Sequence, residues 1–227
     1  MSFIVGIDGP AGSGKGTVTK KIANILGLTN IDTGSTYRCV ALEVLNRGIQ
    51  LDDVNNIIKV AEDINIEIET NKDGDKVYLN GEDVTLKIRS KDVTKIVSPI
   101  SSIKEVRFKM VDLQRKLAEG KDVIMEGRDI CTYVFPNADV KIYLDASVEE
   151  RAKRRYLENQ EKGINMSYEE IFENIKKRDE NDKNKEIGAL KLAKDSIIVD
   201  TTCLTIDQVV DKIIDIIKQN PNFSIKH

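Results

Sequence analysis

The residues with the clearest chemical potential lie near the start of the chain, in the run Gly9-Pro10-Ala11-Gly12-Ser13-Gly14-Lys15-Gly16-Thr17. An apolar run over 3–7 precedes it, and a helical pattern over 18–26 follows it. Glycines let the backbone between a strand and a helix curl until successive N–H groups point at an anion, and the helix N-terminus adds partial positive charge. Lys15 adds a mobile ammonium group that can reach the outer phosphates of a nucleotide. The segment therefore predicts a binding site for a nucleoside triphosphate.

The residue after the lysine departs from the commonest form of such a loop. Gly16 follows Lys15, and the first hydroxyl comes one position later, at Thr17. A hydroxyl next to the lysine is thus missing as a direct magnesium ligand, and we expect Thr17 to act on phosphate or through metal-bound water. An ordinary glycine-rich turn is the alternative, which four glycines and a lysine at this spacing disfavour.

A second polar segment, Asp32-Thr33-Gly34-Ser35-Thr36-Tyr37-Arg38, follows the apolar run over 29–31. Ser35 or Thr36 is expected to cap the helix that comes next. Tyr37 shares a helical face with apolar residues and is expected to pack. Arg38 lies off that face, where it either faces a cleft or is solvated.

A third polar segment, Glu126-Gly127-Arg128-Asp129, follows the apolar run over 123–125. Ligands of open α/β sheets bind beyond the carboxyl ends of strands, so a guanidinium there could grip phosphate through a bidentate fork. A charged exposed turn is an equally weighted alternative.

The most basic part of the chain extends from Arg151 to Lys185. Some of it is expected to be ordinary surface, with i,i+4 pairs such as Glu150 and Arg154. The run Ser167-Tyr168-Glu169-Glu170 predicts a capping box that starts a helix. If that helix continues, Arg178, Asp182 and Lys185 share one face. The pattern is typical of a cation-rich helical lid that closes over phosphates, with a solvated charged hairpin as the alternative.

Five apolar runs separated by helical patterns must position these segments. Such alternation predicts an α/β fold with a doubly wound, five-stranded parallel sheet. The predicted strands are Phe3–Ile7, Thr29–Ile31, Asp122–Met125, Val140–Leu144 and Ser196–Val199. Amphipathic helices are predicted over 103–117, ended by Gly120, and over 206–217, ended by Pro221.

Residues 64–90 follow a different period. Isoleucines at 64, 66 and 68 alternate with polar residues, and the alternation resumes at Val77 and Leu79. Turn signals occur at Lys72-Asp73-Gly74 and at Asn80-Gly81. The pattern predicts a small antiparallel β insertion, either a surface decoration or a movable flap beside the ligand site.

Bulk properties narrow the function. The 227 residues carry a formal net charge of −3, which disfavours a surface built for nucleic acid polymers. The three cysteines, Cys39, Cys131 and Cys203, are scattered, so we expect reduced thiols in a cytoplasm. No apolar run suits a signal peptide or a membrane span. The single histidine is His227, the last residue, which disfavours histidine general-base chemistry and histidine metal sites.

This inventory suits phosphoryl transfer, in which alignment and charge stabilisation do most of the catalysis. If the acceptor is itself a phosphate, its oxygen is already anionic and needs no general base. The arginines must then offset repulsion between two polyanions, which costs several kcal/mol even at an effective dielectric constant of about 20. A lid that excludes water would also prevent hydrolysis of the triphosphate.

Taken in order, the phosphate loop, the second and third polar segments, the β insertion and the Arg178–Lys185 pattern resemble those of bacterial cytidylate kinases. The likeness continues through Val134-Phe135-Pro136 and Val140–Ser147 and covers nearly the whole chain. The loop alone is common to many families, whereas the set in this order is specific. The resemblance implies a P-loop kinase that transfers the γ-phosphoryl group of ATP, with Mg²⁺, to CMP or dCMP.

The resemblance also implies an organisation of the chain. A single kinase domain spans 1–227, with its core at 1–31, 120–148 and 195–227. A nucleoside-monophosphate-binding region spans 32–119 and contains a β insert at 64–96, and a helical lid spans 149–194. We expect a cytoplasmic monomer whose partners are ATP, CMP and dCMP rather than a nucleic acid polymer or a membrane.

The family's site residues map onto matching positions in this chain. The run Gly9–Thr17 holds ATP, and Thr33, Tyr37 and Arg38 line the acceptor site, with Arg38 on the CMP phosphate. The positions that read the cytosine edge are Ser98, Arg107 and Asp129. The phosphate contacts are Arg128 and Lys185, and the pentose contacts are Arg178 and Asp182. The catalytic cations are Lys15, Arg128, Arg178 and Lys185. The magnesium ligands stay open, with Asp129 or Asp145 acting through water as one option.

Three positions depart from the family pattern. Lys185 stands where arginine is usual, which keeps the charge but loses the fork. Cys131 replaces a usual glycine, and we expect an ordinary backbone there. Gly188-Ala189-Leu190 lacks a proline before the leucine, which is expected to loosen the lid.

Other functions remain as alternatives. A kinase of another small acceptor, such as UMP or shikimate, would share most of these features. A non-enzymatic nucleotide switch, such as a GTPase, usually carries an Asn-Lys-x-Asp segment, which neither Asn159–Lys162 nor Asn184–Ile187 matches. An RNA-binding protein is disfavoured by the acidic balance and the low aromatic content.

Overall fold

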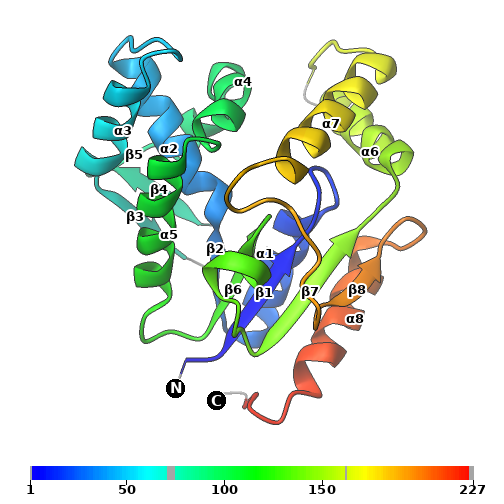
Figure 1. Ribbon diagram of the computed structural model, residues 1–227. Coiled ribbons are helices and arrows are strands. Elements are labelled where there is room, and N and C mark those ends of the chain that lie inside the picture. Colours follow the sequence, from blue (N-terminus) through cyan, green and yellow to red (C-terminus); the bar gives the residue numbers. More distant parts are fainter. Residues whose placement is uncertain (1, 71–74, 162, 225–227) are drawn as a thin grey trace.

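The computed structural model describes residues 2–70, 75–161 and 163–224, so the turn predicted at 72–74 lies outside the described residues. A parallel sheet with the strand order β2-β6-β1-β7-β8 forms its centre (Figure 1). The strands are β1 (Ile4–Asp8), β2 (Thr29–Asp32), β6 (Val123–Gly127), β7 (Val140–Asp145) and β8 (Ile197–Asp200). All neighbouring pairs are parallel, which confirms the five predicted strands.

Both faces of this sheet are covered, as a doubly wound fold requires. Helices α1 (Lys15–Leu26) and α8 (Ile206–Lys218) pack on one face, over residues such as Val5 and Ile124. Helix α5 (Lys104–Ala118) and a short π-helical turn, η2 (Ile130–Val134), pack on the other face. The predicted amphipathic helices over 103–117 and 206–217 are thereby confirmed.

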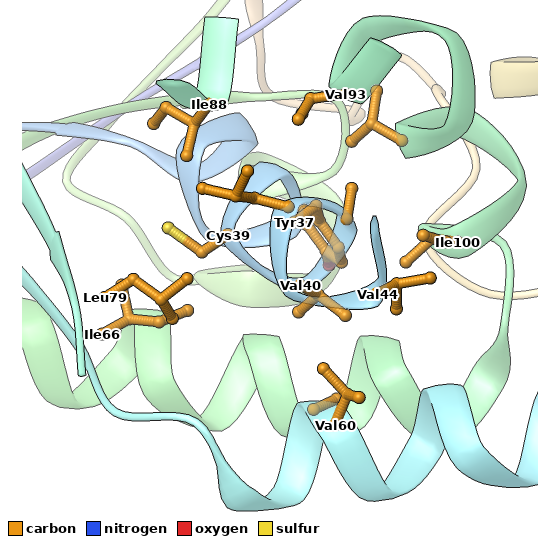
Figure 2. Packing of buried hydrophobic residues seen from close by; sticks show 14 of the residues in the cluster. Tyr37, Cys39, Val40, Val44, Val60, Ile66, Leu79, Ile88, Val93 and Ile100 are labelled. Atoms are coloured by element: carbon orange, nitrogen blue, oxygen red, sulfur yellow. The ribbon is translucent and has the colours of Figure 1, made fainter. Parts of the chain in front are cut away.

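A second layer of helices stands beside β2. It contains α2 (Thr33–Asn46), α3 (Val54–Asp63), the 3₁₀ turn η1 (Lys87–Arg89) and α4 (Lys91–Ile100). Figure 2 shows how α2 is surrounded by apolar side chains from α3, α4 and the small sheet. This separate core lets the layer hold its shape next to the central sheet.

The predicted β insertion is confirmed as a three-stranded antiparallel sheet of β3 (Ile66–Glu69), β4 (Lys76–Leu79) and β5 (Glu82–Asp83). The turn signal Asn80-Gly81 connects β4 to β5, with φ angles of 51° and 84°. Asparagine and glycine are the residues that tolerate two successive positive φ angles in a tight hairpin.

The start of α2 differs from the prediction. Asp32 occupies the N-cap position, while Ser35 and Thr36 lie inside the first turn and donate to the carbonyls of Asp32 and Thr33. The helix begins directly after β2, so no residue is left between them for a serine or threonine cap.

Helices α6 (Val148–Glu161) and α7 (Tyr168–Lys183) form a hairpin above the carboxyl ends of the strands, across from α2 and α4 (Figure 1). The capping box of Ser167 and Glu170 is present, and Glu150 pairs with Arg154 at 3.0 Å. Helix α7 ends at Lys183, so the prediction that Lys185 shares a helical face with Arg178 and Asp182 is wrong. None of the described helices has the length and apolar composition needed to span a bilayer.

Asp8 connects the end of β1 to the segment that follows β6. Its carboxylate accepts hydrogen bonds from the backbone N–H groups of Ile130 and Cys131, both at 2.8 Å. Burial raises the pKa of Asp8 to about 6, although these two hydrogen bonds oppose the rise. Asp8 therefore fixes the start of η2 at the expense of burying a carboxylate.

Substitution of Asp8 by asparagine should change the pH dependence of stability. Because the folded pKa lies above the value of an exposed aspartate, the contribution of Asp8 is fully present at low pH and is lost as pH rises through about 6. The wild-type free energy of unfolding, relative to Asp8→Asn, should fall by about 1 kcal/mol between about pH 5 and pH 7. Urea titrations at several pH values measure this difference, and a difference that does not change with pH would contradict it.

Candidate active site

A cleft of about 630 Å³ opens at the carboxyl ends of β1, β2 and β6. The α2–α4 layer and the α6–α7 hairpin form its two sides (Figure 1). All ten residues matched to the acceptor site line it, together with the outer part of the phosphate loop. The predicted residues in its wall are Gly12, Gly14, Lys15, Gly16, Thr17, Thr33, Tyr37, Arg38, Ser98, Arg107, Arg128, Asp129, Arg178, Asp182 and Lys185.

The phosphate loop has the backbone geometry that its glycines predict. Gly12 and Gly14 adopt φ angles of +80° and +91°, and Gly14 is the N-cap of α1. The first N–H groups of a helix have no carbonyl one turn earlier, so they are available to an anion. The ammonium of Lys15 donates to the carbonyls of Gly9 and Pro10, both at 2.8 Å. Burial lowers the pKa of Lys15, and the charge of Arg128 lowers it further.

Glu126 explains why glycine follows the lysine. A Cβ atom at Gly16 would lie 3.0 Å from Oε1 of Glu126, so a larger residue would crowd this carboxylate. Burial and the nearby Asp32 raise the pKa of Glu126 to about 7, against the charge of Lys15. Glu126 is not among the site residues predicted from the sequence, although its place at the end of a buried strand next to Gly127 was a usable signal.

Three arginines bring positive charge to the cleft. Arg128 donates from Nε to Asp182 Oδ2 at 2.9 Å, and Nη1 of Arg38 donates to the carbonyl of Ile88 and to the hydroxyl of Thr94. Arg178 has no hydrogen bond or ion pair with any residue that the structure describes. Burial, and then the charge of Arg128, lower the pKa of Arg178 to about 10. This concentration of positive charge makes the cleft suited to anions.

Asp182 holds two of the cations together. Its second oxygen accepts a hydrogen bond from Lys185 Nζ at 2.9 Å, and the same ammonium donates to Ser101 Oγ at 3.1 Å. Burial raises the pKa of Asp182, but Arg128 and Lys185 outweigh it and lower the pKa to about 2. Lys185 thus joins the segment after α7 to the end of α4, even though it lies outside the helix.

A second polar site lies deeper, around Arg107. This buried arginine pairs with Asp129, donates to the carbonyl of Ser101 at 3.0 Å and lies over the ring of Tyr37. Arg107 Nε and the hydroxyl of Tyr37 are buried without a hydrogen-bond partner among the described residues. Buried donors without partners are costly, so this site is suited to a ligand with polar edges.

Gly188 closes this deeper site. A Cβ atom there would lie 1.9 Å from Arg107 Nη2, and its φ of +64° favours glycine. A proline at position 189 would push residue 188 toward an extended backbone. With alanine instead of proline at position 189, Gly188 can keep its positive φ angle and its backbone can lie directly against the Arg107–Asp129 pair.

Cys131 shows no strain, as predicted. Asn80 is the only non-glycine with a positive φ among the described residues, so Cys131 has an ordinary backbone. Its thiol packs against Gly6, where an added Cβ would lie 2.8 Å from Sγ.

Several placements differ from the sequence analysis. Asp145 does not line the cleft, and its carboxylate accepts a hydrogen bond from the N–H of Ala146. Arg151, grouped with the basic surface region, is buried beneath the phosphate loop. Arg89 and Arg155 also line the cleft. Arg89 belongs to no predicted motif, and Arg155 was grouped only with the basic region.

Comparisons with known proteins agree with this geometry. The sequence model of the family described as "Cytidylate kinase" matches residues 5–219. The cytidylate kinase of Caldicellulosiruptor saccharolyticus is 47% identical over 212 residues, covering 93% of this chain and 94% of its own length. That of Fusobacterium nucleatum is 48% identical over 210 residues, covering 92% and 94%.

Solved structures show the same fold at low sequence identity. An uncharacterized protein from Eubacterium ventriosum has a TM-score of 0.53 at 13% identity and covers 96% of this chain and 99% of its own. TT1252 from Thermus thermophilus has a TM-score of 0.50 at 15% identity, with 98% and 99% covered. The phosphate loop, the arginine-lined cleft and the match along almost the entire sequence have one common explanation, which confirms the resemblance drawn from the motifs: the chain belongs to the cytidylate kinase family.

Proposed function

We propose that this protein transfers the γ-phosphoryl group of ATP to CMP or dCMP, forming ADP and CDP or dCDP. The carrying observation is one cleft that joins a phosphate loop, a group of arginines and a buried polar site suited to a base. Membership of the family supports this activity over the alternatives of another small acceptor or a nucleotide switch.

The donor and the acceptor take opposite sides of the cleft in this proposal. The triphosphate lies on the N–H groups at the start of α1, with Lys15 on its outer phosphates. Arg38 and Arg128 bind the phosphate of the acceptor, and Arg178 lies between the two anions. Their positive charge offsets the repulsion that aligned phosphates experience and stabilises the charge of the transferred group. The acceptor oxygen is anionic, so no side chain needs to remove a proton.

Magnesium fits the donor set, although the described residues contain no cluster of three or more protein ligands for it. Glu126 and Asp32 line the cleft next to Gly16 and Thr17, where carboxylates could hold the water shell of the ion. An ion held there would supply positive charge that stabilises the negative charge developing on the transferred phosphate. Residues 16 and 17 then position the phosphates rather than supply a direct hydroxyl ligand.

The cytosine edge is proposed to bind at Ser98, Arg107 and Asp129. Arg107 Nε is a free donor there, and Asp129 offers acceptor oxygens. The pentose is proposed to lie on Arg178 and Asp182, and the remaining phosphate contact is Lys185.

We also propose that the chain is one kinase domain with a core at 1–31, 120–148 and 195–227. Residues 32–119 form the acceptor-binding region in this proposal, and residues 149–194 form a lid. The hairpin of α6 and α7 has a small core of its own, built around Ala152, Ile171 and Ile175, which suits movement as a unit. A cytoplasmic monomer is also proposed; the cysteines are all unpaired, as a reducing compartment would leave them.

A panel of acceptors tests the proposed function. ADP formation from ATP and Mg²⁺ should be rapid with CMP and dCMP and slow with AMP, GMP, UMP or shikimate. The preference over AMP in kcat/KM should be about a hundredfold or more, because a purine leaves buried polar groups unpaired at a cost of about 1–3 kcal/mol each. A preference for AMP would contradict the specificity, and GTP binding that ignores CMP would favour a switch.

Arg107→Lys should relax base selection. The lysine keeps a cation beside Asp129 but loses the second donor group, so the preference for CMP over AMP should fall about tenfold while the KM for ATP stays within about twofold. Lys109→Gln, at an exposed position of the same helix, is the control. Equal loss with every acceptor would show that Arg107 does not read the base.

Lys185 tests the phosphate side of the acceptor site. Lys185→Arg should leave kcat/KM for CMP unchanged or higher, since it restores a fork near Asp182. Lys185→Met should lower kcat/KM about tenfold or more, because it leaves the buried Asp182 with one partner fewer. Steady-state kinetics measure both, and a large loss in Lys185→Arg would contradict the assigned contact.

A further inference from the structure

Arg151 connects the phosphate loop to the hairpin. It is 3% exposed, and three guanidinium nitrogens each donate a hydrogen bond. Nη1 donates to the carbonyl of Ala11 at 2.9 Å, Nε to the carbonyl of Ala146 at 3.0 Å, and Nη2 to Asp179 Oδ2 at 2.7 Å. One side chain thus contacts the loop, the residue that directly follows β7, and helix α7.

Gly12 of the loop also lies close to Arg151 in α6. A Cβ atom at Gly12 would lie 3.4 Å from Cβ of Arg151. Ala11 and Gly12 therefore both lie next to Arg151. A displacement of Ala11 relative to α6 would strain or break the hydrogen bond from Arg151 Nη1.

Asp179 is the residue of α7 that binds Arg151. It is 7% exposed, and its other oxygen, Oδ1, has no hydrogen-bond partner among the described residues. Asp179 follows Arg178 directly and precedes Asp182 by about one helical turn. Because a helix is stiff over one turn, the position of Asp179 sets the positions of Arg178 and Asp182 in the cleft.

We propose that Arg151 and Asp179 are positioning residues that couple the phosphate loop to the acceptor site. A triphosphate bound to the loop would fix the positions of Ala11 and Gly12. Through its hydrogen bonds, Arg151 would then fix Asp179, and with it the face of α7 that lines the cleft. Donor and acceptor then strengthen one another's binding, equally in both directions. This inference rests on the proposed function, which assigns Arg178 and Asp182 to the acceptor.

The test measures the coupling between the two ligands. Titration calorimetry gives the Kd of CMP alone and with a saturating, non-hydrolysable β,γ-imido analogue of ATP and Mg²⁺. The unmodified protein should bind CMP about tenfold more tightly with the analogue present. The ratio should fall to about twofold or less in Asp179→Asn and in Arg151→Lys, because neither keeps the full set of charge-assisted bonds.

Controls separate coupling from simple loss of structure. Glu180→Gln makes the same charge change at an exposed position of α7 and should keep the tenfold ratio. The double variant should lose no more coupling than either single variant, as expected for residues that act as a pair. Arg151→Lys keeps a cation beside Asp179, so it tests the same ratio if Asp179→Asn does not fold.

Three results would overturn the inference. Both single variants could keep the tenfold ratio while their melting temperatures fall, which would make the pair merely structural. The double variant could lose clearly more coupling than either single one. The unmodified protein could bind CMP equally with and without the analogue. CMP-dependent ADP formation from ATP by the same protein preparation, measured separately, would still support the proposed function in all three cases, whereas its absence would contradict that function directly.

Discussion

The main physical constraint on this structure is that several positively charged side chains lie close together in one cleft. Lys15, Arg38, Arg128 and Arg178 converge there, and burial together with mutual repulsion lowers the pKa of Lys15 and Arg178. Asp182 offsets part of this repulsion by binding Arg128 and Lys185. Arg178 keeps no ion pair among the described residues, so much of the compensation is left to a ligand. The clustered positive charge is unfavourable without anions, which supports the proposal that two phosphate groups bind side by side.

The positively charged residues of the cleft come from different elements of the fold. The central sheet supplies the phosphate loop and Arg128, the α2–α4 layer supplies Arg38, and α7 supplies Arg178 and Asp182. The α2–α4 layer, the central sheet and the α6–α7 hairpin are each built around an apolar cluster. Polar contacts also join the elements, such as Lys185 with Ser101 and Arg151 with Ala11. Polar contacts of this kind can be exchanged for contacts with a ligand at small net cost.

Much of this arrangement follows from the sequence, for identifiable reasons. The five strands and the phosphate loop are local patterns, in which apolar runs and glycine spacing carry the information. The acceptor residues came from resemblance, and the cleft brings all of them together. Residues whose role depends on a distant contact were missed. The guanidinium of Arg151 is buried because Ala11 and Asp179 receive it, and nothing in its neighbours along the chain marks it as different from Arg154 or Arg155. Likewise, the end of α7 at Lys183 moved Lys185 off the predicted face, although it still reaches Asp182.

The most direct measurement of the central claim is binding of an inhibitor that joins adenosine and cytidine 5′-ends through five phosphates. If one cleft holds both nucleotides with their phosphates aligned, calorimetry should show one molecule bound per chain, about a hundredfold or more tighter than ATP or CMP alone. The bound inhibitor should exclude both nucleotides. Affinity no greater than that of ATP, or CMP binding that persists in the presence of the inhibitor, would contradict a single cleft shared by two anions.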